Sequence, residues 1–105
     1  MAIPFTTINL DKPRKLKFGL GAMVQFEQYT GKKLTEIGSD MSIETAAQML
    51  WAMLKQEEPG ITPEQVYALV DDNADNMTDV MSAITEALQA AFGQSERKNS
   101  GKPKA

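Results

Sequence analysis

The chain has 105 residues, with 11 basic and 14 acidic side chains, so its formal net charge is −3. That length suits one small domain, and 42% hydrophobic with 24% charged residues is the composition of an ordinary soluble globular protein. With no Cys and no His, the sequence excludes disulfides, thiolate or imidazole metal sites, Cys nucleophiles and acid–base catalysis by imidazole.

The first predicted element is a β-hairpin from about residue 5 to residue 19. Apolar and polar residues alternate on both sides of the polar segment Asp11-Lys12-Pro13-Arg14, which favours a turn. An isolated hairpin is only marginally stable, so we expect its apolar side to pack on helices. That side carries Thr6, Ile8, Leu10, Leu16 and Phe18.

A helix is predicted over residues 20–30, with Gly31 as its C-terminal stop. Its expected apolar face holds Leu20, Met23 and Val24, with Phe26 beside it. Glu27 falls on the same face, where a carboxylate needs a partner. Either it reaches solvent or a neighbouring backbone N–H at the margin of the core, or it forms a structural ion pair with Lys or Arg. Neither interpretation is catalytic, since no second acid, base or nucleophile can be assigned beside it.

A second helix is predicted over residues 43–57, after a loop or short helical turn. Ser42 is a good N-cap and Glu44 suits the positive end of the helix dipole, while Pro59-Gly60 forces the helix to end before it. Its broad apolar stripe suggests that it is the central helix. The stripe is formed by Ile43, Ala46, Ala47, Leu50, Trp51 and Leu54.

Two further helices are predicted over residues 63–72 and 77–92. Thr62, Pro63 and Gln65 form a capping-box pattern at the start of the first, and Gly93 ends the second. Asn76 or Thr78 is expected to cap the last helix. The expected inner faces are Val66, Leu69 and Val70 on the first, and Met77, Val80, Met81, Ile84, Leu88 and Ala91 on the second.

The predicted fold is therefore a mostly α-helical α+β domain over residues 1–93, an N-terminal β-hairpin packed on a bundle of about four helices. Residues 94–105 are polar and basic, and we expect them to form a disordered tail. The prediction requires four side chains of the two longest helices to be buried, Leu50, Leu54, Ile84 and Leu88.

The charges are strongly segregated along the chain. Residues 56–93 carry eight acidic side chains and no basic one. A block of one sign is usually a solvated face, and the functional alternative is docking to a basic partner. The only dense basic group in the sequence is Lys12, Arg14, Lys15 and Lys17. The last two predicted helices are acidic, which disfavours a helix-turn-helix reader at that end, so no nucleic-acid partner is expected.

One acidic segment partly matches the pattern of a calcium-binding loop. Asp71, Asn73 and Asp75 have the spacing of the first ligands of a calcium loop, but Asn76 stands where that loop needs Gly and Ser82 where it needs Glu. We therefore interpret these residues as helix ends and caps. No metal, cofactor or catalytic site is expected, and no apolar run is long enough for a membrane span. A signal peptide is not apparent, which predicts a cytoplasmic protein.

Three apolar side chains are candidates for partner binding. Trp51 and Met53 diverge from the central line of their helix, and Met49 belongs to the chain's seven Met residues, whose flexible side chains suit adaptable surfaces. The alternative is that these residues belong to the core.

Six short segments resemble one family when taken in order across residues 6–92. They are Ile8-Asn9-Leu10-Asp11, Leu16-Lys17-Phe18, Phe26-Glu27-Gln28-Tyr29-Thr30-Gly31-Lys32, Leu50-Trp51-Ala52-Met53-Leu54, Ile61-Thr62-Pro63-Glu64-Gln65-Val66 and Ile84-Thr85-Glu86-Ala87-Leu88. In order, spacing and chain length they are similar to the small tail assembly chaperones of long-tailed bacteriophages and prophages.

The resemblance implies a non-enzymatic role in viral tail assembly. Such chaperones coat the aggregation-prone tape measure protein in the host cytoplasm, keep it soluble while tail tube subunits polymerise around it, and are absent from the mature virion. The expected partners are the tape measure protein, tail tube subunits and further copies of this chain, with no membrane partner. Many phages also make a longer chaperone by ribosomal slippage; Gly101-Lys102 is compatible with a slippery site, and Gly31-Lys32 equally so.

Two alternatives from other functional classes remain at this point. One is a structural tail or head-tail component that stays in the virion, and purified particles would contain it. The other is a small adaptor or regulatory protein of the prophage or host, which salt-dependent DNA binding or a single folded partner would reveal.

Overall fold

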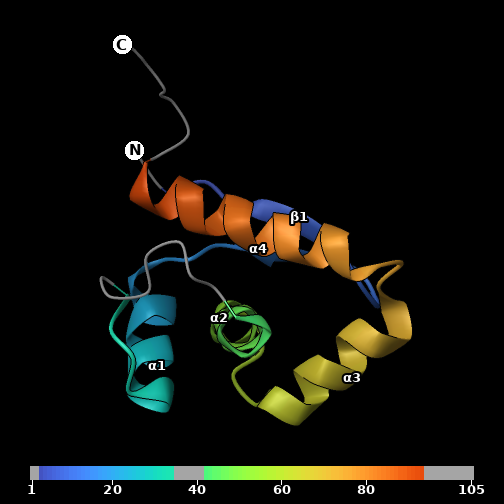
Figure 1. Ribbon diagram of the computed structural model, residues 1–105, viewed down its shortest axis with the longest axis horizontal. Coiled ribbons are helices and arrows are strands. Elements are labelled where there is room, and N and C mark those ends of the chain that lie inside the picture. Colours follow the sequence, from blue (N-terminus) through green and yellow to red (C-terminus); the bar gives the residue numbers. More distant parts are fainter. Residues whose placement is uncertain (1–2, 35–41, 94–105) are drawn as a thin grey trace.

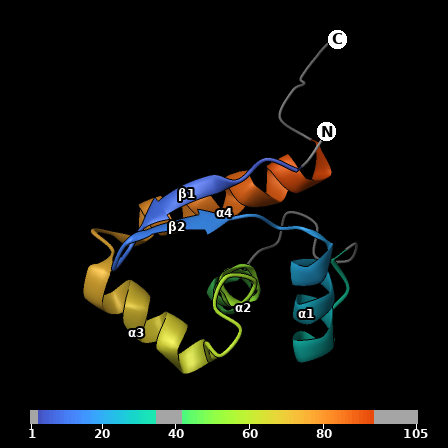
Figure 2. The same ribbon diagram turned by 180° about the vertical axis from the view of Figure 1, so that it is seen from behind.

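The computed structural model describes residues 3–34 and 42–93, which form a mostly helical α+β fold. A two-stranded antiparallel sheet precedes four helices, and Figures 1 and 2 show α2 viewed along its axis between the other elements. The expected fold class is confirmed. The elements are β1 (Thr6–Asn9), β2 (Pro13–Leu16), α1 (Leu20–Thr30), α2 (Ile43–Lys55), α3 (Pro63–Asn73) and α4 (Met77–Phe92).

The hairpin pairs Thr6 with Leu16 at one end and Asn9 with Pro13 at the turn. Pro13 is the first residue of β2, a position where its missing N–H is tolerated. Ile8 and Leu16 are buried because the hairpin packs on α4 and α2. Figure 2 shows the two strands running alongside α4, which gives the marginal hairpin the support it needs.

Helix α2 is central, as its apolar stripe predicts. It packs against α1, α3, α4 and β2, and Leu50 and Leu54 are both buried. The Ser42 hydroxyl accepts a hydrogen bond from the Thr45 N–H at 3.1 Å, which confirms the N-cap. The expected burial of Ile43 is wrong, because this side chain is 72% exposed. Helical periodicity fixes which residues share a face, but not where along the axis the neighbouring helices end.

Helix α1 ends as expected at Gly31, whose φ of 74° is the left-handed conformation that glycine favours. The predicted inner face is wrong: Leu20 is 75% exposed and Val24 is 44% exposed. The helix instead buries Ala22 and Phe26, with Met23 partly buried beside them. Phe26 meets the ring of Phe18 edge-on, so aromatic packing on the segment between β2 and α1 fixes which face of this short helix turns inward.

The last two helices follow their predicted signals closely. Thr62 and Gln65 form the reciprocal capping box, Asn76 caps α4 by accepting from the Asp79 N–H, and Gly93 takes a left-handed φ of 68°. Ile84 is buried, whereas Leu88 is only partly buried against the core. Within residues 3–34 and 42–93, no helix is long and apolar enough to cross a membrane. The expected tail, residues 94–105, lies outside the described residues.

Candidate binding groove

The three side chains that the sequence suggested for partner binding lie in the core. Met49 and Met53 are each 1% exposed and Trp51 is 6% exposed, so their expected surface position is wrong. The indole Nε1–H of Trp51 donates to the carbonyl of Ile61 at 3.0 Å, and the Tyr29 ring covers it at 4.7 Å between centroids. Trp51 therefore joins α2 to the α2–α3 loop and to α1. Residues outside the central stripe of α2 are also buried, because α2 has neighbouring elements on several sides.

Glu27 lies at the exposed side of α1. Its Oε2 accepts a hydrogen bond from the Leu34 backbone N–H at 3.0 Å. This arrangement fits the first interpretation of Glu27, a carboxylate at the margin that satisfies a neighbouring backbone donor. The residue helps to hold the segment after α1.

A groove of about 400 Å³ lies between α2, α3 and α4. Figure 1 shows α3 and α4 spreading apart from the turn that joins them, with α2 in the space between. The groove is lined by the N-terminal halves of α2 and α4 and by most of α3. The apolar lining consists of Ile43, Ala46, Ala47, Leu50, Val66, Tyr67, Val70, Met77, Val80, Met81 and Ile84.

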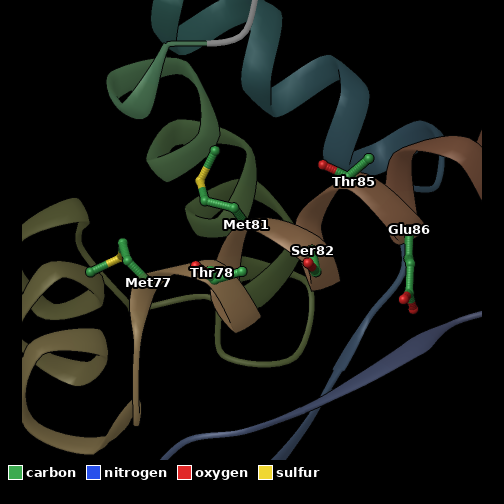
Figure 3. A pocket seen from close by; sticks show the side chains of 6 residues that line it. All are labelled: Met77, Thr78, Met81, Ser82, Thr85 and Glu86. Carbon is green, nitrogen blue, oxygen red and sulfur yellow. The ribbon is translucent and has the colours of Figure 1, made fainter.

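Large apolar side chains at the mouth of this groove remain open to solvent. Ile43 on α2, Tyr67 on α3 and Met77 on α4 are 72%, 44% and 48% exposed. Figure 3 shows the α4 side, where Met77 reaches toward α3 and Met81 toward α2, while Glu86 points away from both. Three helices therefore present apolar atoms to one concave surface, an arrangement typical of interaction sites.

The charges around the groove are negative. Glu44 and Asp71 line it, and none of its lining residues is basic. Lys32 pairs with one of these acids: its Nζ lies 3.8 Å from Glu44 Oε1, and both side chains are well exposed. A pair of that length in solvent contributes little, so the Glu44 carboxylate is still available to a partner.

Arg14 does not belong to an exposed basic surface. It is 5% exposed, and its guanidinium binds both carboxylate oxygens of Asp11 at 3.0 Å and Glu58 at 2.9 Å. The hydrogen bonds from Arg14 lower the pKa of the Asp11 carboxyl, and those carboxylates raise the pKa of Arg14. This cluster ties the hairpin turn to the loop after α2 and leaves Lys12, Lys15 and Lys17 as the exposed basic side chains of the hairpin.

Two kinds of possible catalytic site were considered among residues 3–34 and 42–93, a metal site and a cluster of hydroxyl side chains. No group of three His, Cys, Asp or Glu side chains there is arranged to hold a metal ion. A shallow surface on α4 carries Thr78, Ser82 and Thr85 beside the Glu86 carboxylate (Figure 3), and all four side chains are exposed to solvent. The arrangement that stands out is thus an apolar groove suited to binding.

The sequence did not predict that Ile43, Tyr67 and Met77 line one groove. It assigned Ile43 and Met77 to inner faces and gave Tyr67 no role, because a periodic pattern cannot distinguish a filled interface from an open one. One signal was present: Tyr67 is a large aromatic residue beside, not within, the buried stripe of Val66 and Val70. Comparisons with known proteins found no matching family model, no matching curated protein and no matching solved structure.

Proposed function

We propose that this chain is a tail assembly chaperone of a long-tailed bacteriophage or prophage, which binds the tape measure protein and keeps it soluble during tail tube assembly. The open groove between α2, α3 and α4 carries the proposal, because a chaperone needs apolar surface that its client can reach. The six ordered segments that resemble this family support it independently.

The shape of the groove suits a helical client. An amphipathic helix can lay its apolar stripe into a groove between helices, using residues one turn apart as anchors. A tape measure protein is long and rich in such helices, so several copies of this chain along one client would gain affinity through avidity. The proposed role is non-enzymatic.

The proposal includes a location and a set of partners. The protein acts in the cytoplasm of the bacterial host, associates with further copies of itself and with tail tube subunits, and leaves before the virion is complete. Nucleic acid and membrane have no part in it.

The test is co-expression with the long coiled-coil-rich protein encoded just downstream of the gene. We expect the wild-type chain to raise the soluble yield of that protein and to form a complex with several copies per partner, measured by light scattering. The double variant Ile43→Ser with Met77→Ser, which removes apolar atoms from the mouth of the groove, is expected to lower the yield.

Helix α1 offers a matched control. Leu20 and Val24 are 75% and 44% exposed, close to the 72% and 48% of Ile43 and Met77, and they lie outside the groove. The variant Leu20→Ser with Val24→Ser is expected to retain client binding. An insoluble partner beside a free wild-type chain would overturn the proposal, and detection of the chain in purified particles would select a structural tail component instead.

A further inference from the structure

We infer that the groove between α2, α3 and α4 selects a basic amphipathic helix, whose apolar stripe fills the groove and whose Lys or Arg side chains meet acidic groups at its edge. This inference names the chemistry of the client. It rests on the proposed function for the source of that helix, but its selectivity can be measured with peptides alone.

The charge of the groove's edge is the first argument. We call Glu44 and Asp71 the acidic rim, since both line the groove, one on α2 and one on α3. Helices α3 and α4 have the same sign, because they carry no basic residue and expose further carboxylates. These exposed acids are Glu64, Asp72, Asp79 and Glu86. A helix with cations beside its apolar stripe gains attraction here, and an acidic one is repelled.

The length of the groove sets how much of a helix it can engage. On α4 the lining runs from Met77 to Ile84, which at 1.5 Å per residue is about 10 Å, or two helical turns. A client helix would therefore place three or four apolar residues at i, i+3, i+4 and i+7 in the groove. Exposed Tyr67 offers it an aromatic face, on which a Lys or Arg side chain can also rest.

Charge argues against the two occupants that this chain could supply itself. A second copy docked groove to groove would bring the same carboxylates against the acidic rim. The chain's own residues 94–105 carry four basic side chains but no apolar residue except the terminal Ala, so they cannot fill the apolar groove. A separate, basic helical partner satisfies both requirements.

The test uses three synthetic peptides of about 18 residues, long enough to form a helix that spans the groove. They share one Leu and Ala stripe, and the positions beside it are Lys, Gln or Glu. Binding to the full chain is measured by fluorescence anisotropy of a dye on the peptide. We expect the Lys peptide to bind at least about tenfold more tightly than the Gln peptide at low salt, and the Glu peptide most weakly. Raising the salt to about 0.5 M should remove most of the difference.

Variants locate the effect. Glu44→Gln with Asp71→Asn should bring the Lys and Gln peptides to within about twofold of each other, because the rim charge is removed and the apolar lining is kept. The control Glu57→Gln removes an exposed carboxylate that neither lines the groove nor lies on α3 or α4, and it should leave most of the preference. Ile43→Ser should weaken all peptides alike.

The inference is wrong if the Lys and Gln peptides bind equally, or if the control variant removes the preference as fully as the rim variant. It is also wrong if the chain dimerises through the groove, seen as a dimer that Ile43→Ser abolishes while no peptide binds. Its failure is distinguishable from that of the proposed function. A tape measure protein kept soluble without any charge preference overturns only the inference, whereas tight Lys-peptide binding beside an insoluble tape measure protein overturns only the function.

Discussion

At the scale of single residues, the buried guanidinium of Arg14 forms a cluster with two carboxylates, Asp11 and Glu58. A buried guanidinium is tolerated only where carboxylates pair with it, and here Asp11 holds it in a two-point contact while Glu58 binds the remaining end. The contact with Glu58 joins residues far apart in the sequence. Arg14 consequently acts on the relative position of the hairpin and α2.

The cluster predicts how stability depends on pH. Hydrogen bonds from Arg14 hold the pKa of Asp11 below its ordinary value of 3.8 in the folded protein. The stabilisation is therefore complete above pH 3.8 and is lost as the pH falls through the lowered folded value. We expect Asp11→Asn to unfold at lower urea concentration than the wild type at pH 7, and the difference between the two midpoints to shrink as the pH is lowered below 3.8. A difference that stays the same across this range would show that the Asp11 charge does not contribute.

At the scale of elements, the ends of the helices are the most predictable part of the molecule. The signals are short and local: Ser42 and Asn76 accept from backbone N–H groups of the first turn, and Gly31 and Gly93 adopt the left-handed conformation at the C-terminal end. Such chemistry depends on the nearest few residues alone. The inner face of α1 was not predictable in the same way, because its orientation depends on the contact of Phe26 with Phe18 in the segment between β2 and α1.

The capping box of α3 can be tested by one substitution. Thr62→Ala removes the hydroxyl that accepts from the Gln65 N–H at 3.2 Å, and we expect a loss of about 1 kcal/mol of unfolding free energy. Urea denaturation measures it. Thr78→Ala is the matched control, an exposed threonine in the first turn of α4, where Asn76 already supplies the cap; its effect should stay within about 0.5 kcal/mol. Equal losses in both variants would contradict the role of the box.

At the scale of the whole molecule, the fold covers some apolar side chains and leaves others open, a distinction that the sequence does not make. Hydrophobic periodicity correctly placed α2 at the centre, with Leu50 and Leu54 buried, and it identified α4 as an amphipathic helix. It also placed Ile43 in the buried stripe, although this side chain is exposed, and it left Trp51 open between a partner-binding surface and the core, where the structure places it in the core. Whether an apolar side chain is covered depends on where three helices diverge, which is a property of the assembled fold.

Truncation to Ala distinguishes a covered apolar side chain from an open one. Leu54→Ala, at a side chain with no exposed surface, should cost about 2 to 5 kcal/mol because it leaves a cavity in the core. Ile43→Ala, at 72% exposure, should change the unfolding free energy by no more than about 0.5 kcal/mol. Thermal or urea unfolding of the two variants gives the comparison. A large loss for Ile43→Ala would mean that its side chain is covered in solution, and the groove would then not be open.

The environment of Trp51 gives the molecule a built-in optical probe. It is the chain's single tryptophan, it is buried, its indole N–H is bound to Ile61, and the Tyr29 ring and the Lys55 ammonium group lie against its ring. Its emission therefore reports the short-wavelength spectrum of a dry indole while the core is intact, and it shifts to longer wavelength only when water enters. Because Trp51 does not line the groove, its emission should stay nearly constant when a client binds. Folding can then be followed by Trp51 emission and binding by the anisotropy of a dye on the client, in the same sample.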